Sequence, residues 1–479
     1  MNRKNHYDVI IVGAGPASMF CAYELMGKAK VLIIDAGRRL EHKACPLTSL
    51  GKCQNCKPVC SVLGGMGGSQ FYLGTKLSRY PAGKGLIKFV SSLAELESVY
   101  EYVDRVLEKH GKLPREYPAS DRINHLENHC SQKGLKLKYY NAQKVSSCEM
   151  NNIAQSLFHQ FTYHNIDCHF REKVVGVRSH EIGYEVTTNR CTYCCDKLIF
   201  ATGRLGAASF STLADKLGLE WQESDVSDVE VGIRVETPSH VFMSIDGIHN
   251  DIKLKYTLNE QEDVRSFCQD HCGFLTRCYY NLDQKQAFSS IDGYIMGTER
   301  HEGKKSHVSN LGIHHRFKLA GGISEAHNIV KRISFQGKPL VQSMGSFLGN
   351  NSHSAISIPL SMPDAVQMNI NEFIPYRTSE VIKEFIYRLG DILPGFLHKG
   401  NAVYAPSFEM GGKALQLNSS FESSRQGLYV LGDATGHFRG ALQAMVSGVL
   451  VAQAIQNKSQ TCYASQRYSK ERQVEYVMS

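Results

Sequence analysis

The chain has 479 residues, of which 42% are hydrophobic, and a formal net charge of +8. This length and composition leave room for two domains that each bury a core. The charge is a mild bias over so many residues, so it does not favour nucleic acid as a partner.

No apolar run in the sequence reaches the length of a membrane span, so we expect no membrane partner. The first residues lead straight into an apolar strand and do not resemble a signal peptide. The fifteen cysteines are then expected to be reduced thiols, which predicts a cytoplasmic protein.

The most informative stretch is 7–35, which reads as a strand, a helix and a second strand. Its first apolar run ends at Val12 and is followed at once by Gly13-Ala14-Gly15-Pro16-Ala17-Ser18. A helix-forming stretch comes next, and a second apolar run ends in Asp35. This order is a βαβ unit with a dinucleotide fingerprint inside it.

Each part of the fingerprint has a physical reason. Gly13 allows the tight turn from strand to helix, and Gly15 has no side chain to keep a pyrophosphate from the backbone. The helix N-terminus offers free N–H groups and a positive dipole end. Asp35 can accept hydrogen bonds from a ribose, while Ser18 replaces the usual third glycine with another small residue. We therefore predict a bound dinucleotide.

Two unusual segments follow. The segment 36–60 is rich in loop residues and holds Cys45, Cys53, Cys56 and Cys60. A glycine-dense stretch, 63–70, comes next and can lie close against a ligand, with Gly67, Gly68 and Ser69 as its candidate contacts.

Hydrophobic periodicity predicts the other elements. We expect helices over 91–110, 121–133, 151–163, 378–389 and 438–455, and strands over 135–140, 168–177, 184–188 and 197–201. The strand at 197–201 ends in Ala201-Thr202-Gly203, which is small enough to pass beside a dinucleotide. The backbone around Val174 can pair with an adenine edge.

The region 206–404 is mostly strand-like, and 405–479 returns to the first pattern, with a strand that ends in Gly432-Asp433. We predict an α/β fold with a Rossmann-like, three-layer parallel sheet and an inserted, sheet-rich α+β substrate domain. The expected domains are 1–205 and 405–479 for the cofactor and 206–404 for the substrate.

Three motifs, taken in chain order, resemble the FAD-binding domain of the glutathione-reductase-like flavoproteins. They are the βαβ unit over 7–35, the strand that ends in Ala201-Thr202-Gly203, and the strand that ends in Gly432-Asp433. The resemblance implies FAD as the cofactor. Carried over by motif, and extended to the turns beside each motif, it implies these contacts: Gly13, Gly15, Pro16, Ala17, Ser18, Asp35, Gly67, Gly68, Ser69, Val174, Ala201, Thr202, Gly203, Gly432, Asp433, Gly440, Ala441 and Leu442.

Over nearly its whole length the chain resembles a family of uncharacterised bacterial FAD-dependent dehydrogenases. The resemblance rests on the cysteine segment, on Val231-Gly232-Ile233-Arg234-Val235-Glu236, on Phe267-Cys268, and on the segment from Gly432 to Gly448. The glycine stretch departs from that family's usual pattern, with Lys76 a few residues later. This departure leaves room for a different substrate or acceptor.

Two residues near the last motif are candidates for catalysis. A helix N-terminus aimed at the pyrimidine end of a flavin stabilises negative charge there, and Arg439 would add a fixed positive charge. His437 can act as an acid or base because its unperturbed pKa lies near neutrality. A structural role for Arg439 and a capping role for His437 are the alternatives.

The cysteines allow three interpretations. Cys45, Cys53, Cys56 and Cys60 could ligate zinc or an iron–sulfur cluster, although their spacing fits known sites loosely. They could be a redox pair that shuttles electrons to the flavin. They could also be loop thiols without a role.

The sequence predicts an FAD-dependent oxidoreductase that carries out a two-electron oxidation or reduction of a small organic substrate. No second G-x-G-x-x-G follows a strand, so NAD(P)H would bind only transiently. A redox protein is a further candidate partner. The alternatives are an RNA-modifying flavoprotein and a flavin and cysteine redox sensor or electron carrier.

Overall fold

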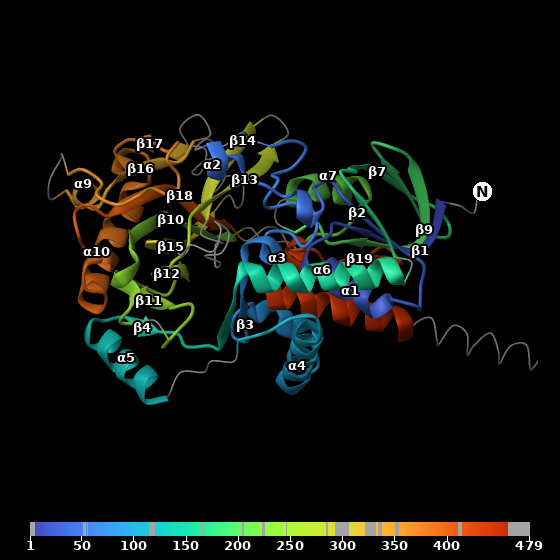
Figure 1. The fold of residues 1–479 in the computed structure, drawn as a ribbon, viewed down its shortest axis with the longest axis horizontal. Coiled ribbons are helices and arrows are strands. Elements are labelled where there is room, and N and C mark those ends of the chain that lie inside the picture. Colours follow the sequence, from blue (N-terminus) through green and yellow to red (C-terminus); the bar gives the residue numbers. More distant parts are fainter. Residues whose placement is uncertain are drawn as a thin grey trace, which may run out of the picture.

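The structure is a computed structural model. It describes residues 5–50, 54, 56–114, 120–164, 166–203, 206–222, 226–245, 247–283, 286–292, 306–320, 332–333, 338–349, 354–410 and 414–457. Two sheets dominate the fold, one on each side of the view in Figure 1. Within the described residues, no helix is long and apolar enough to cross a membrane.

The first sheet has the strand order β6-β2-β1-β9-β8-β7, with β19 also paired to β9. Strands β6, β2, β1, β9 and β19 run parallel to one another. Strand β8 pairs antiparallel with β9, and β7 pairs antiparallel with β8. Their bounds are β1 His6–Val12, β2 Val31–Asp35, β6 Asp167–Phe170, β7 Val174–Ser179, β8 Tyr184–Thr188, β9 Thr192–Phe200 and β19 Leu428–Val430.

Both faces of this sheet are covered, so the strands are apolar throughout. Ile11 faces one core and Ile10 the other, as the alternation of a strand requires. One face packs on α1 (Pro16–Leu25), α4 (Leu93–His110), α6 (Ser147–Tyr163) and the C-terminal helix 441–457. The other face packs on α7 (Ala207–Lys216). This arrangement is the predicted three-layer sandwich.

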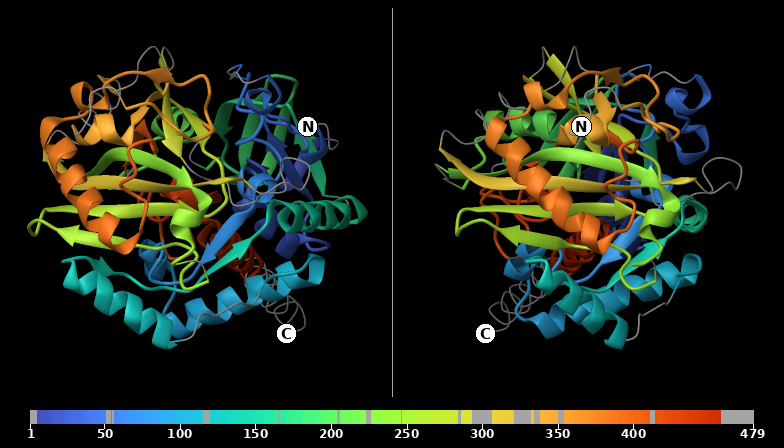
Figure 2. Two further views of the ribbon diagram at one scale, coloured as in Figure 1. Left: turned by 60° about the vertical axis from the view of Figure 1, so that its left-hand side comes forward. Right: turned by 90° about the vertical axis from the view of Figure 1, so that its left-hand side faces the viewer.

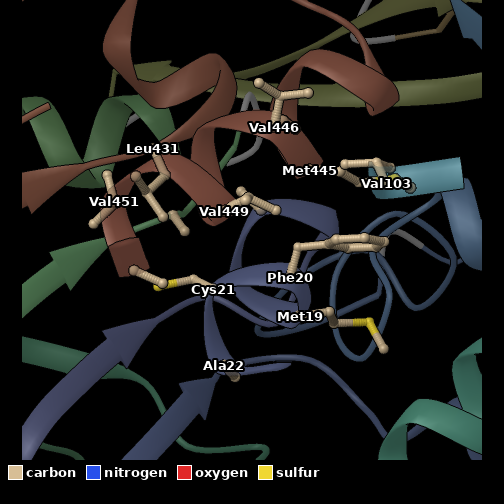
Figure 3. Close-up of a cluster of buried hydrophobic side chains, with 14 of the residues drawn as sticks. Met19, Phe20, Cys21, Ala22, Val103, Leu431, Met445, Val446, Val449 and Val451 are labelled. Atoms are coloured by element: carbon tan, nitrogen blue, oxygen red, sulfur yellow. The ribbon is translucent and has the colours of Figure 1, made fainter. Parts of the chain in front are cut away.

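The C-terminal helix packs directly against α1. Figure 3 shows Phe20 of α1 close to Met445 of the C-terminal helix, with Val103 of α4 beside them. A Cβ added to Gly448 would collide with the carbonyl oxygen of Ala17. Close approach of the two backbones therefore depends on glycine at this position.

The second sheet has the order β17-β16-β18-β10-β15-β12-β11-β4, and every pair except β16–β17 is antiparallel. Helix α10 (Tyr376–Ile392) covers one of its faces (Figure 2). The strand bounds are β4 Lys136–Leu137, β10 Val226–Pro238, β11 Leu254–Thr257, β12 Glu262–Asp270, β15 Val308–Ala320, β16 Leu340–Ser343, β17 Val366–Gln367 and β18 Ala402–Met410.

The described residues also form smaller elements. Strands β3 (Thr75–Ser78) and β5 (Ala142–Val145) pair with each other, as do β13 (Thr276–Asp283) and β14 (Gln286–Asp292). The remaining helices are α2 Pro46–Leu50, α3 Gln70–Leu73, α5 Ser120–Gln132 and α9 Met344–Leu348, and the 3-10 helices are η2 Leu40–His42, η3 Lys84–Phe89, η4 Ser239–Phe242, η5 Ile370–Glu372 and η6 Gly432–Thr435.

The predicted fold class is confirmed: a parallel-rich α/β sheet with additional, mostly antiparallel sheet structure. The division at residues 205 and 404 stays a prediction, although the second sheet takes β4 from before 205 and β18 crosses 404.

Two predicted elements differ from the structure for local reasons. The predicted strand 168–177 is wrong, because Arg171 adopts φ +54 and separates β6 from β7. Helix α6 begins four residues earlier than predicted, because the Ser146 side chain accepts a hydrogen bond from the Glu149 N–H and caps it.

Candidate functional site

A cavity of about 380 Å³ lies at the carboxyl ends of the parallel strands. Residues that follow β1, β2, β9 and β19 all line it, as expected for a ligand site in a parallel α/β sheet. Its volume falls within the range of ~300–1,000 Å³ that is usual for ligand pockets. The predicted residues that line it are Gly13, Gly15, Pro16, Ala17, Asp35, Gly68, Ser69, Val174, Ala201, Thr202, Gly203, Gly432, Asp433, Gly440 and Ala441.

The turn after β1 is built for close approach of a ligand. Gly13 adopts φ +104, and a Cβ there would collide with the carbonyl oxygen of Ala201. A Cβ on Gly15 would meet nothing within 4 Å, because this residue faces open space. Pro16 begins α1, which leaves the other N–H groups of its first turn free for an anion.

Asp35 fixes the same turn from β2. One carboxylate oxygen accepts a hydrogen bond from Ala14 N–H at 2.8 Å, and the other accepts one from Gly37 N–H at 2.6 Å. The carboxylate is therefore held at the edge of the cavity by two backbone groups. Each of its oxygens still has a lone pair for a further donor.

The glycine stretch is tied to both of these turns. Gly67 N–H donates to the carbonyl of Ala14 at 2.7 Å, and Met66 N–H donates to that of Arg38 at 3.0 Å. The Lys43 ammonium donates to the carbonyl of Gly68 at 2.6 Å, and burial lowers the pKa of Lys43 to about 7. Gly68 and Ser69 are thereby presented to the cavity, while Gly67 lies behind them.

Glu172 lines the cavity beside Val174 and was missed by the sequence analysis. Its buried carboxylate accepts hydrogen bonds from the Thr188 hydroxyl at 2.7 Å and the Tyr193 hydroxyl at 3.0 Å. Its backbone N–H donates to the carbonyl of Asp35, which brings two acidic residues to one end of the cavity. No motif marks Glu172, since it sits in an irregular link between strands.

The start of the C-terminal helix also lines the cavity. Gly440 adopts φ +123, and Gly440, Ala441 and Ala444 line the cavity. The N-terminus of a helix of 17 residues therefore opens toward the ligand space, where it favours negative charge. Two predicted contacts, Ser18 and Leu442, are fully buried and are not among the lining residues.

His437 and Arg439 lie in the turn before this helix and are not among the lining residues. The His437 Nε2 atom is 2.7 Å from the carbonyl oxygen of Leu415, its ring packs edge-on against Phe89, and burial lowers the pKa of His437. Arg439 forms an ion pair with Glu409 of the second sheet. Their predicted catalytic roles stay predictions.

The cysteine segment does not show the metal site considered above. Within the described residues, no group of three or more His, Cys, Asp or Glu side chains is arranged to hold a metal ion. Cys45, Cys56 and Cys60 are free thiols, and Cys53 lies outside the described residues. Burial raises the pKa of Cys60, with a smaller contribution from Cys45 and Cys56 nearby. Zinc and iron–sulfur ligation is therefore not supported.

A buried ionic cluster joins the two halves of the fold. The Lys76 ammonium, on β3, lies 3.1 Å from an Asp270 oxygen and 3.3 Å from an Asp251 oxygen. Arg234 of β10 lies 3.5 Å from the other Asp270 oxygen. Burial raises the pKa of Asp270 to about 6 even beside these two cations. Sequence alone gave no reason to bring these four residues together.

Comparison with known proteins gives a limited match. No family model matches the chain. It is 27% identical over 223 residues to the ribosomal RNA dihydrouridine synthase of Escherichia coli K12, an alignment that covers 44% of this chain and 45% of that protein. The chain thus matches less than half the length of this curated relative.

Solved structures that resemble the chain are distant. CtdE in complex with FAD is 12% identical, with a TM-score of 0.36 over 97% of this chain and 91% of that one. Glycine oxidase from Geobacillus kaustophilus is 11% identical, with a TM-score of 0.39 over 95% and 94%. A mutant of the halogenase PltM in complex with FAD is 12% identical, with a TM-score of 0.41 over 95% and 70%.

Proposed function

We propose that the chain binds FAD in the cavity at the carboxyl ends of β1, β2, β9 and β19, and that it is a flavin-dependent oxidoreductase. The observation that carries the proposal is that two helix N-termini line one cavity. The Gly13–Pro16 turn leads into α1, and Gly440 and Ala441 begin the C-terminal helix. The dianionic pyrophosphate of a dinucleotide would bind at the N-terminus of α1. In FAD, the flavin ring would lie at the N-terminus of the C-terminal helix.

The residues present fit this cofactor. The open space at Gly15 lets a pyrophosphate reach the free N–H groups of α1. The carboxylate of Asp35, which lines the cavity, can accept hydroxyl hydrogen bonds and repels an added phosphate. It favours an unphosphorylated ribose over a 2′-phosphorylated one.

Bound FAD would supply a carrier for two electrons, and the chain would supply the rest of the chemistry. The start of the C-terminal helix stabilises negative charge at its end of the cavity. The ion pair between Arg439 and Glu409 holds β18 of the second sheet beside the turn that precedes this helix. We propose a small organic molecule as the substrate, with NAD(P)H as a transient electron donor.

The test is the flavin content of purified protein, measured from the visible spectrum before and after the chromophore is released. Wild-type protein should carry close to one flavin per chain. Gly15→Val, which fills open space without backbone strain, should lose most of it while the protein keeps its thermal unfolding temperature. The control is Gly176→Ala, since Gly176 has no positive φ, a Cβ there would make only ordinary contact with Thr187 at 3.8 Å, and the residue lies outside the cavity. Wild-type protein without any bound flavin would refute the proposal.

A second candidate function has a specific observation in its favour. The partial similarity to a ribosomal RNA dihydrouridine synthase supports an RNA-modifying flavoprotein, in which a uracil base would be the molecule reduced. The test is the dihydrouridine content of ribosomal RNA from cells with and without the gene. Identical contents would exclude this candidate and leave the flavin proposal standing.

A further inference from the structure

The second sheet carries a polar row on the face that is turned away from α10. On β10, the apolar residues at odd positions from 229 to 235 belong to the core under α10. Because side chains alternate along a strand, the residues between them lie on the opposite face. In Figure 1 the second sheet lies between α10 and the first sheet, so this opposite face is turned toward the half of the fold that holds the cavity. Its residues on β10 are Glu230, Gly232, Arg234 and Glu236.

Gly232 leaves a gap in the middle of this row. It is opposite His314 in the β10–β15 register and opposite Ser407 in the β10–β18 register. A Cβ at Gly232 would collide with the carbonyl oxygen of Ile313. Because no side chain stands between them, the His314 imidazole and the Ser407 hydroxyl meet across β10, with Nε2 2.7 Å from Oγ. Both residues are buried, with 1% and 2% of their surface exposed.

The His314 ring is also held from its other sides. Its Nδ1 atom lies 3.7 Å from a carboxylate oxygen of Glu230, and the Arg265 Nε–H donates to that same oxygen at 3.1 Å. The Phe267 ring stacks on the imidazole, with 4.9 Å between the ring centres and 20° between the planes. A carboxylate, an imidazole and a hydroxyl therefore follow one another in space. Proteins use this order to move a proton to or from the hydroxyl group.

The strand that carries Ser407 also reaches the turn beside the cavity. Glu409 lies on the same face of β18, about 7 Å further along the strand, and forms the ion pair with Arg439. Gly440 directly follows Arg439 and lines the cavity. His314 and Ser407 are not among the lining residues, so they lie beside the turn that precedes the C-terminal helix.

Charged groups surround the imidazole on every strand that packs against it. Lys253, just before β11, lies 5.5 Å from the centre of the Phe267 ring. The other charged groups form three ion pairs, which are Glu230–Arg265, Arg234–Asp270 and Glu409–Arg439. Because the two carboxylates nearest the ring, those of Glu230 and Glu409, each pair with an arginine, a proton added to this group should bind to the imidazole.

We propose that Ser407 and His314 are the proton-transfer pair of the flavin site, with Ser407 as the catalytic hydroxyl and His314 as the positioning residue that acts through it. The inference rests on the proposed flavin function, because it assigns the proton path of that site. Reduction of an unsaturated organic substrate adds two electrons and two protons. The electrons and one proton come from NAD(P)H by way of the flavin. The second proton leaves the Ser407 hydroxyl, which regains a proton from Nε2 of protonated His314.

The test counts the protons that the full chain takes up when its bound flavin is reduced, and it needs no substrate. The reduction potential of the flavin is measured between about pH 6 and pH 9 by equilibration with reference dyes. Its slope against pH gives the number of protons that accompany two electrons. The variants are His314→Gln and Ser407→Ala, and the control is His125→Gln at an exposed position of α5. Flavin content and thermal unfolding are measured on each variant.

Negative charge that arrives with the electrons favours a proton on His314, so wild type should take up about two protons per flavin near pH 7. His314→Gln should take up about one. Ser407→Ala removes the acceptor for the Nε2 proton, so its two-proton range should move about one pH unit lower. The control should match wild type.

Uptake of one proton by wild type at every pH would overturn the inference and leave the flavin proposal standing. A match between wild type and either His314→Gln or Ser407→Ala would overturn it as well. If His314→Gln does not fold, the shift of Ser407→Ala decides. Wild-type protein without flavin would instead refute the proposed flavin function.

Discussion

At the scale of single residues, the cavity was largely predictable because its glycines and Asp35 are set by backbone geometry. Gly13 needs a positive φ and has no room for a Cβ, so the strand–turn–helix pattern identifies it without any tertiary information. Glu172 could not be found in this way, since its burial depends on Thr188 and Tyr193 from other strands. His437 was predicted to act as an acid or base or to cap the helix; its ring nitrogen lies 2.7 Å from the carbonyl oxygen of Leu415, and its catalytic role stays a prediction.

The clearest single-residue prediction concerns Glu236. Its carboxylate is fully buried, and burial raises its pKa from 4.5 to about 7 although Ser361 and the Tyr404 hydroxyl donate hydrogen bonds to it. The folded state then binds a proton more tightly than the unfolded chain between about pH 4.5 and pH 7. The stability that this group contributes is fully present below pH 4.5 and is lost as the pH rises through 7. The free energy of unfolding should therefore fall by about 3 kcal/mol between these two pH values.

Glu236→Gln keeps the acceptor oxygen and removes the titration. The variant should match wild type near pH 4.5 and exceed its stability at pH 8 by up to about 3 kcal/mol, as measured by denaturant unfolding at a series of pH values. Glu101→Gln, at an exposed position of α4, serves as the control and should change stability little at any pH. A constant difference between Glu236→Gln and wild type across the pH range would contradict this explanation.

At the scale of elements, long periodic helices were predicted well and link regions were not. The predicted helix 91–110 corresponds to α4, and 121–133 corresponds to α5, because apolar residues recur at helical spacing in both. The predicted strand 168–177 failed at Arg171, where a left-handed residue creates the bend that presents Glu172 and Val174 to the cavity. The C-terminal helix begins at 441 because Gly440, with φ +123, does not have a helical backbone conformation.

Packing of the C-terminal helix on α1 gives a prediction at this scale. Ala usually stabilises a helix relative to Gly by about 1 kcal/mol. Gly448→Ala should do the opposite, by at least about 2 kcal/mol, because its Cβ would collide with the carbonyl of Ala17 and push α1 away. Thermal and denaturant unfolding measure this change.

Because α1 carries the N–H groups that face the cavity, the same variant should also retain less flavin if the proposed function holds. Gln453→Ala, on the exposed side of the same helix, should stay within about 0.5 kcal/mol of wild type. An unchanged or higher stability of Gly448→Ala would show that the two backbones can separate without cost.

At the scale of the whole molecule, the sequence could not predict how the two sheets meet. Lys76 on β3 reaches Asp251 and Asp270 across long stretches of chain, and no local pattern encodes those partners.

Lys76 is the residue on which this junction depends most directly. Its mostly buried ammonium group, on β3, forms ion pairs with Asp251 and with Asp270, the last residue of β12 in the second sheet. It also donates a hydrogen bond to the carbonyl of Gln269. Lys144, opposite Lys76 in the β3–β5 pair, donates to the carbonyl of His271 at 3.0 Å. Two lysines from neighbouring strands thus hold the segment 269–271 against the cofactor side.

Lys76→Met should destabilise the protein by about 3–5 kcal/mol, because it leaves two buried carboxylates without their shared cation. Adding Asp270→Asn should recover part of that loss, since one of the carboxylates is then neutral, and the double-variant cycle measures the coupling between the two positions. Lys144→Met removes the hydrogen bond to the carbonyl of His271 and a weaker charge interaction with Asp270, and it should cost less. If Lys76→Met and Lys144→Met cost the same and Asp270→Asn gives no recovery, the cluster is not what holds the two sheets together.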